Sequence, residues 1–328
     1  MTGSVTGSTT GTASVTAGVG GGVGLTALMV AAARAIEAAR PDALARDVYA
    51  EHFVRAAPAC ADWPLHPDEV PAGEADPLWG RLGRYFGLRT RVFDDYLLSR
   101  AEAGTRQVVV LGAGLDTRAY RLAWPRGCAV FEVDQEAVLA FKEHVLRTTP
   151  YPGSAAGSDA ARTAGVGRAT AGTAAGARRI PVVADLRHEW IPALTAAGFD
   201  PSRPTTWLAE GLLLYLPSAA ERLLINTVAA HSVPGSALAY EAKVTLESAA
   251  VRDSPVYTAA RRRIGVDLPA LFDPDPRPDS ATALAGHGWR TWTDTPFDHS
   301  RRLGRGPLPV PDDALAANRW TFAEHVLR

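Results

Sequence analysis

The stretch RQVVVLGAGLDTRAYRLAWP, residues 106–125, decides the fold of this chain. Its valine-rich part, residues 107–111, predicts a short buried β-strand. Gly112-Ala113-Gly114 follows directly, and residues with helical spacing come next. This order lets the backbone approach a ligand closely and exposes amides at a helix start, as nucleotide-like cofactors require. We therefore expect a cofactor beside Gly112 and Gly114, although Gly-x-Gly alone is a weak signal.

Strand-like and helical segments alternate beyond this point. An alternation of this kind predicts an α/β fold with a doubly wound, mostly parallel sheet. Two weaker strand candidates near the C-terminus predict an antiparallel hairpin. The expected strands after the first are 128–134, 179–185, 205–216 and 236–241, with helices at 137–146 and 218–231 and the terminal strands at 289–294 and 318–326.

The chain before the first strand is predicted to be helical from about 25 to 105, with Gly104 as a helix stop. The apolar run 23–33 has no basic residue before it and is too short to span a bilayer, so we interpret it as a packed helix. Residues 1–22 and 153–177 consist mainly of small and polar residues. We expect a disordered tail and a low-complexity insertion, within a single domain spanning 23–328.

The composition of the chain limits the classes of binding partner that we expect. The chain has 328 residues, 47% of them hydrophobic, and a formal net charge of -1, so no overall field favours nucleic acid or a membrane surface. A small-molecule partner fits better. Two cysteines are too few for a disulfide framework and favour a cytoplasmic location. The eight histidines are scattered without ligand spacing, so no metal site is expected.

Asp134 closes the second expected strand, 20 residues after Gly114. A carboxylate at this place can accept hydrogen bonds from both ribose hydroxyls of a nucleotide. The alternative is a helix N-cap, because a helical segment follows. We favour the ribose role, since strand, glycine turn and acidic end occur in the required order.

Two further strand ends carry candidate site residues. Asp185 and Leu186 follow the third strand, where the carboxylate could accept from an adenine amine and the leucine could form an apolar wall. Glu210 lies within an apolar run and needs a partner if buried. The partner is either a cofactor ammonium or an arginine inside the fold. A dinucleotide fingerprint would place a third glycine where Thr117 stands, which disfavours NAD.

Beyond these single residues, long stretches of the sequence resemble a known protein family. The chain resembles the leucine carboxyl methyltransferase-like family of S-adenosylmethionine-dependent methyltransferases, in particular its bacterial branch. The resemblance covers most of residues 26–241 and is far more specific than the glycine turn alone. The matching runs are ALMVAAARAIEAARPDALARD (27–47), GLRTRVFDDYLL (87–98), RQVVVLGAGLDTRAYRLAWP (106–125), VFEVDQEAVLAFK (130–142), VVADLRHEW (182–190) and AAGFDPSRPTTWLAEGLLLYLP (196–217).

The resemblance implies a role for each candidate. Arg89 should bind the cofactor carboxylate, with Arg91 as the neighbouring alternative, because a guanidinium can hold a carboxylate through two hydrogen bonds. The other implied contacts are Gly112 with the methionyl portion, Asp134 with the ribose, Asp185 and Leu186 with the adenine, and Glu210 with the methionyl end.

The expected activity is O-methylation of a small molecule with S-adenosylmethionine as donor. A carboxylate acceptor would need no general base, whereas a hydroxyl would. No catalytic residue, acceptor identity or oligomeric state follows from the sequence. The rival classes are an NAD-dependent oxidoreductase and a non-catalytic protein that binds the cofactor.

The segment Val244 to Phe272 follows the fifth strand and contains three consecutive arginines, 261–263. Segments beyond strand ends usually carry specificity, so we expect it to cover the acceptor side of the site. The alternative is a surface helix whose arginines face water.

Overall fold

The computed structural model of the chain describes residues 23–148, 177–243 and 248–326. The expected tail, 1–22, lies outside these residues. So does the expected insertion, 153–177, except for Ala177.

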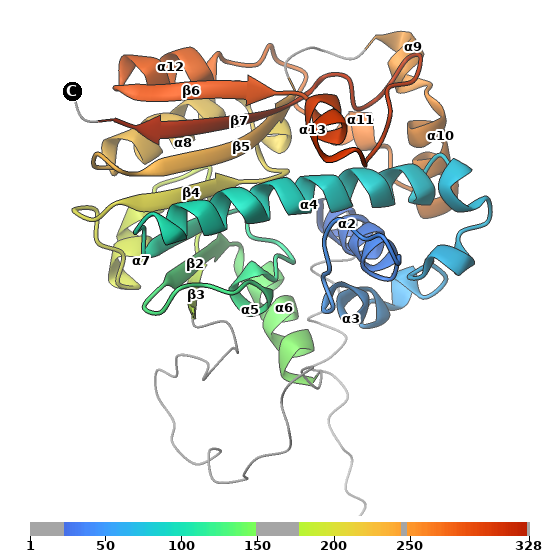
Figure 1. The fold of residues 1–328 in the computed structure, drawn as a ribbon, viewed down its shortest axis with the longest axis horizontal. Helices are drawn as coiled ribbons and strands as arrows, with labels where there is room; N and C mark the ends of the chain where they lie inside the picture. The colour runs from blue at the N-terminus through green and yellow to red at the C-terminus, as the bar shows by residue number, and fades with distance from the viewer. Residues whose placement is uncertain (1–22, 149–176, 244–247, 327–328) are drawn as a thin grey trace, which may run out of the picture.

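Within the described residues, seven strands form one sheet in the order β3-β2-β1-β4-β5-β7-β6 (Figure 1). The first five strands run parallel to their neighbours, and β7 is antiparallel to both β5 and β6. The doubly wound, mostly parallel sheet is therefore confirmed. The strands are β1 (Gln107–Leu111), β2 (Ala129–Asp134), β3 (Arg178–Val183), β4 (Thr205–Ala209), β5 (Ala237–Lys243), β6 (Trp289–Asp294) and β7 (Asn318–His325).

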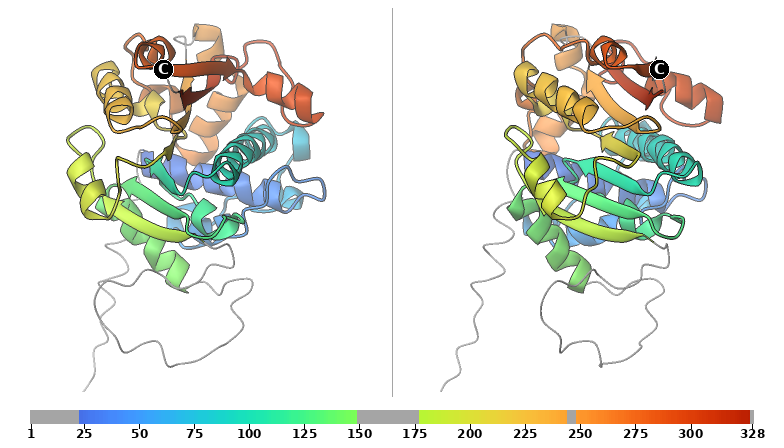
Figure 2. Two further views of the ribbon diagram at one scale, coloured as in Figure 1. Left: turned by 60° about the vertical axis from the view of Figure 1, so that its left-hand side comes forward. Right: turned by 90° about the vertical axis from the view of Figure 1, so that its left-hand side faces the viewer.

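Helices cover both faces of the sheet, and Figure 2 shows α4 and α8 on opposite sides of it. Alternate β1 residues point to the two cores: Val108 and Val110 pack with α2 and α4, whereas Val109 and Leu111 pack with α7 and α8. One face carries α2 (Val23–Ala38), α4 (Trp79–Glu102) and α6 (Glu136–Thr148), and the other carries α7 (Ile191–Ala196), α8 (Ser218–Ala230) and α12 (Ser280–Gly286).

The N-terminal apolar run forms α2 and is packed as expected, with Leu28, Ala32 and Ile36 almost fully buried. No helix in the described ranges is long and apolar enough to cross a membrane. The shorter helices are α3 (Ala50–Arg55), η1 (Pro58–Cys60), η2 (Pro67–Glu69), η3 (Gly73–Ala75), α5 (Arg118–Arg121), η5 (Leu213–Tyr215), α9 (Ala249–Arg252), α10 (Pro255–Ile264), α11 (Leu268–Leu271) and α13 (Pro296–Leu303).

One expected boundary was wrong, and the structure adds detail to two other expectations. The fourth strand ends at Ala209, not at 216, because Gly211 adopts a left-handed φ of 61° and the apolar residues beyond it form η5. The helix after the glycine turn is the single turn α5. The C-terminal strands do pair, but α13 lies in their connection, so they are not joined by a tight turn.

Candidate active site at the carboxyl edge of the sheet

A cavity of about 550 Å³ lies along the carboxyl ends of the parallel strands. It spans the point where β1 has β2 on one side and β4 on the other, which is where open α/β sheets bind ligands. Helices α2, α4, α10 and α11 contribute further walls. All the predicted site residues line this one cavity: Arg89, Gly112, Gly114, Asp134, Asp185, Leu186 and Glu210.

The glycine turn after β1 requires its glycines. Gly112 and Gly114 have φ values of 63° and 46°, a region that residues with a Cβ rarely adopt. A Cβ on Gly112 would lie 2.9 Å from Cδ1 of Leu212. The turn thus brings bare backbone to the cavity, as the sequence predicts.

Asp134 lies beside this turn. Its carboxylate accepts hydrogen bonds from the backbone amides of Gly114, at 2.6 Å, and Gln135, at 2.7 Å. Neither residue belongs to α6, which begins at Glu136, so the side chain does not act as the alternative N-cap. Burial raises the pKa of Asp134, and the two amides only partly offset this effect.

Asp185 and Leu186 follow β3 and form the far end of the cavity. Asp185 is partly exposed and is held by the guanidinium of Arg187, with the shortest contact at 2.6 Å. This ion pair lowers the pKa of Asp185 to about 2, so the carboxylate is charged at neutral pH. Leu186 is buried and supplies the expected apolar wall.

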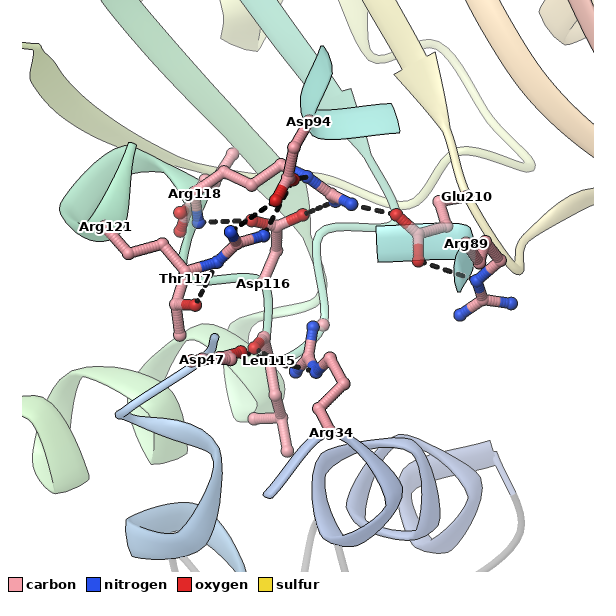
Figure 3. A network of polar contacts seen from close by, with 12 residues as sticks. Arg34, Asp47, Arg89, Asp94, Leu115, Asp116, Thr117, Arg118, Arg121 and Glu210 are labelled. Carbon is pink, nitrogen blue, oxygen red and sulfur yellow. Dashed lines mark hydrogen bonds and ion pairs between the residues drawn. The ribbon is translucent and has the colours of Figure 1, made fainter. Parts of the chain in front are cut away.

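Glu210 meets arginine partners inside the fold, which was one of the two alternatives for this residue. Its Oε1 lies 2.7 Å from Nε of Arg89, and its Oε2 lies 2.7 Å from Nη1 of Arg118 (Figure 3). Burial would raise the pKa of Glu210, but the two arginines outweigh burial and lower it. The carboxylate is therefore charged in the wall of the cavity.

Arg89 is shared between two carboxylates. In addition to Glu210, its Nη1 donates to Oε2 of Glu241 at 2.6 Å. Its guanidinium also lies 4.6 Å from the ring centroid of Phe86. Arg91, the alternative, is about half exposed, pairs with Asp95 and is not part of the cavity wall. Only Arg89 of the two can meet a ligand there.

The sequence analysis did not assign several residues that complete the site. Arg118 has no distinguishing signal in a chain so rich in arginine. Glu241 stands at the end of the fifth expected strand and could have been found by the same argument as Asp134. It accepts from the Tyr85 hydroxyl and from Nε1 of Trp320, and Nδ2 of Asn318 donates to that hydroxyl at 2.6 Å.

The end of the cavity beyond β5 is aromatic, with one ammonium group. Nζ of Lys243 donates to Oη of Tyr257, at 3.2 Å, and to the carbonyl of Ala314, at 3.0 Å. It lies 5.1 Å from the ring centroid of Phe272. The ring of Tyr215 lies 6.0 Å from that of Phe272. We call this region, defined by Tyr215, Lys243, Tyr257 and Phe272, the acceptor compartment.

The expected cover is placed over this compartment. Val256, Tyr257, Leu268 and Phe272 all line the cavity, whereas residues 244–247 lie outside the described ranges. The three arginines take no part in the cavity wall; Arg263, for example, pairs with Asp76 at 2.5 Å. The segment therefore forms a wall of the site, and its movement stays a prediction.

The sheet order and the cavity at the carboxyl ends of β1 and β4 define a Rossmann-like α/β fold that binds its ligand at the point where the strand order reverses. The chain belongs to the leucine carboxyl methyltransferase family, whose model matches residues 27–229. The family expected from the sequence is thereby confirmed.

Two sequence relatives agree with this assignment. A protein of Streptomyces coelicolor is 56% identical over 92% of each chain, and one of Saccharopolyspora erythraea is 44% identical over 88% of this chain and 90% of its own. Both are named, provisionally, as S-adenosyl-L-methionine-dependent methyltransferases. A crystal structure from Thermobifida fusca, provisionally a methyltransferase, is 18% identical with a TM-score of 0.46, covering 90% of this chain and 94% of that one.

Proposed function

We propose that the chain binds S-adenosylmethionine along the carboxyl edge of the sheet and transfers its methyl group to an oxygen atom of a small molecule. The observation that carries the proposal is that residues from four strand ends meet in one cavity. In this arrangement Asp185 and Leu186 hold the adenine and Asp134 the ribose. Gly112, Gly114, Glu210 and Arg89 hold the methionyl end.

The charges in the cavity wall fit this cofactor. The methionyl end of the cofactor carries both a carboxylate and an ammonium. The cavity wall presents a group of opposite charge for each, Arg89 and Glu210, with Nε of Arg89 2.7 Å from Oε1 of Glu210. Nη2 of Arg89 is not engaged by a side chain in the described part of the chain and can donate to a carboxylate. Asp134 is charged above its raised pKa and can accept from ribose hydroxyls.

S-adenosylmethionine supplies a methyl group already activated on a sulfonium. The protein then needs chiefly to align the acceptor and to exclude water. Aromatic and aliphatic residues from η5, α10 and α11 line the cavity and can exclude water from the acceptor compartment. Their rings also offer flat apolar surfaces against which a small acceptor can stack.

Within O-methylation, the cavity favours a carboxylate acceptor. Glu241 lines the cavity on the same strand as Lys243, but both of its carboxylate oxygens already accept hydrogen bonds, from Tyr85, Arg89 and Trp320, so it is not free to take a proton from an acceptor. An ionised carboxylate needs no base. Lys243 can attract it, since a carboxylate is a stronger acceptor than the neutral Tyr257 hydroxyl.

Calorimetry with S-adenosylhomocysteine and with NAD tests the cofactor. We expect binding of the first only, and binding of NAD alone would overturn the proposal. Transfer of a labelled methyl group to a panel of aromatic and aliphatic acids, with the matching alcohols as controls, tests the acceptor. Methyl esters release their label in alkali, whereas methyl ethers keep it. Label that survives alkali would show a hydroxyl acceptor.

A matched variant tests the acceptor compartment. Lys243→Gln removes the ammonium and should lower kcat/KM for an acid at least about tenfold, the loss of a charge-assisted hydrogen bond. Its affinity for S-adenosylhomocysteine should stay unchanged. Equal turnover of the acid by both proteins would exclude Lys243 as the group that binds the carboxylate.

A further inference from the structure

Arg118, the first residue of α5, is buried at the centre of an ion-pair network (Figure 3). Its Nε donates to Oδ1 of Asp94 at 2.7 Å, and its Nη1 pairs with Glu210 at 2.7 Å and also with Asp116. The backbone amide of Arg118 donates to Oδ1 of Asp116 at 2.7 Å. One side chain thus joins carboxylates from α4, from the glycine turn and from the end of β4.

These partners place Arg118 behind the site and not inside it. Glu210 and Asp116 line the cavity, whereas Arg118 does not. Asp116 ends the turn that begins at Gly112, and Glu210 also pairs with Arg89. Arg118 can therefore reach a ligand only through the groups that it holds.

The neighbouring Arg121 provides a natural comparison. Its side chain is also largely buried, and it binds Asp94 through contacts of 2.5 and 2.8 Å and Thr117 at 3.2 Å. It pairs with neither Asp116 nor Glu210 among the described residues. Asp94 thus has two arginine partners, whereas Asp116 is held by Arg118 alone within the described ion pairs.

We propose that Arg118 is a positioning residue, which holds the glycine turn through Asp116 and orients Glu210 toward the methionyl end of the cofactor. The inference rests on the proposed binding of S-adenosylmethionine. Asp185 is held by Arg187, and Asp134 keeps the amide of Gln135, which lies outside the glycine turn, so loss of Arg118 should disturb the methionyl end and leave the adenosine end largely intact.

Two ligands separate these ends. S-adenosylhomocysteine carries the complete amino-acid group, and 5′-methylthioadenosine lacks it. In calorimetry with Arg118→Lys, which keeps the charge but cannot bridge three carboxylates, we expect the affinity for S-adenosylhomocysteine to fall about tenfold or more. The affinity for 5′-methylthioadenosine should change less than about twofold, the scatter of neutral substitutions. The matched control Arg121→Lys should leave both affinities within that range.

Equal losses for both ligands, or unchanged binding of S-adenosylhomocysteine, would overturn the inference. Wild-type protein that binds neither ligand would instead refute the proposed function. If Arg118→Lys does not fold, Asp116→Asn decides the question, because it keeps the volume and removes the charge that Arg118 holds. It should show the same selective loss, and wild-type affinity for both ligands would contradict the positioning role.

Discussion

At the adenine end of the cavity, Asp185 is partly exposed and pairs with Arg187, two residues further along the chain. At the centre, Glu241 is buried and pairs with Arg89, which is 152 residues away in sequence. Water can solvate Asp185 if its partner is lost, whereas the buried carboxylate has no such substitute. The comparison predicts that breaking the central ion pair lowers the free energy of unfolding. Breaking the peripheral ion pair should leave stability unchanged and affect only the affinity for the ligand.

The largest effect is expected for Arg89→Met. This change leaves Oε2 of Glu241 without its charged partner, while Glu210 keeps Arg118. We expect the free energy of unfolding, measured in urea without ligand, to fall by about 3–5 kcal/mol. The peripheral control Arg187→Met should stay within about 0.5 kcal/mol of wild type. Similar values for both variants would remove the distinction between the two regions.

A second effect concerns Glu37 of α2, which packs beneath α4 and accepts from the amide of Leu44 at 2.8 Å. Burial raises the pKa of Glu37 to about 7. Between the ordinary pKa of a glutamate and pH 7 the folded state therefore binds more protons than the unfolded state. Raising the pH through this window lowers the free energy of unfolding, by up to roughly 3 kcal/mol.

Glu37→Gln does not titrate, so it should lack this part of the pH dependence. The measurement is urea unfolding of both proteins from pH 5 to pH 8, and the quantity of interest is the difference between them. We expect the variant to gain stability relative to wild type as the pH rises. A constant difference across the range would show that Glu37 is already ionised in the folded protein at pH 5.

A smaller effect is expected for Asp134→Ala, because the side chain accepts only from backbone amides and from the proposed ribose. Affinity for S-adenosylhomocysteine should fall by about 1–3 kcal/mol, the cost of leaving ligand hydroxyls without their acceptor. Calorimetry on the folded variant measures this loss. Unchanged affinity would exclude the ribose role and leave Asp134 as a support for the Gly114 amide.

The smallest effect is expected for Asp185→Ala. A single hydrogen bond to an adenine amine at a partly exposed site contributes about 0.5–1.5 kcal/mol. Affinity for S-adenosylhomocysteine should fall by this amount, and the free energy of unfolding should stay within about 0.5 kcal/mol of wild type. A loss larger than that of Asp134→Ala would reverse the order of the two contacts.

Local patterns were sufficient for the parts of the fold that depend on neighbours in sequence. The strand at 107–111 has the predicted bounds, because its short valine-rich run favours a buried strand and the glycine turn directly after it ends that strand. The fourth strand was extended too far, since an apolar run alone does not distinguish a strand from a buried turn. Gly211 was the local signal for the break.

The sequence by itself determined the class of sheet and the strand-end residues Gly112, Asp134 and Asp185, because these follow from short-range patterns. It also determined the family, because long runs of the chain carry the resemblance. Only the tertiary structure decided that Glu210 pairs with Arg89 and Arg118, and that Lys243 lies among aromatic rings. The physical reason is that a buried charge must be matched by whichever opposite charge the packing brings near it. That partner comes from distant segments, and no spacing along the chain reveals it.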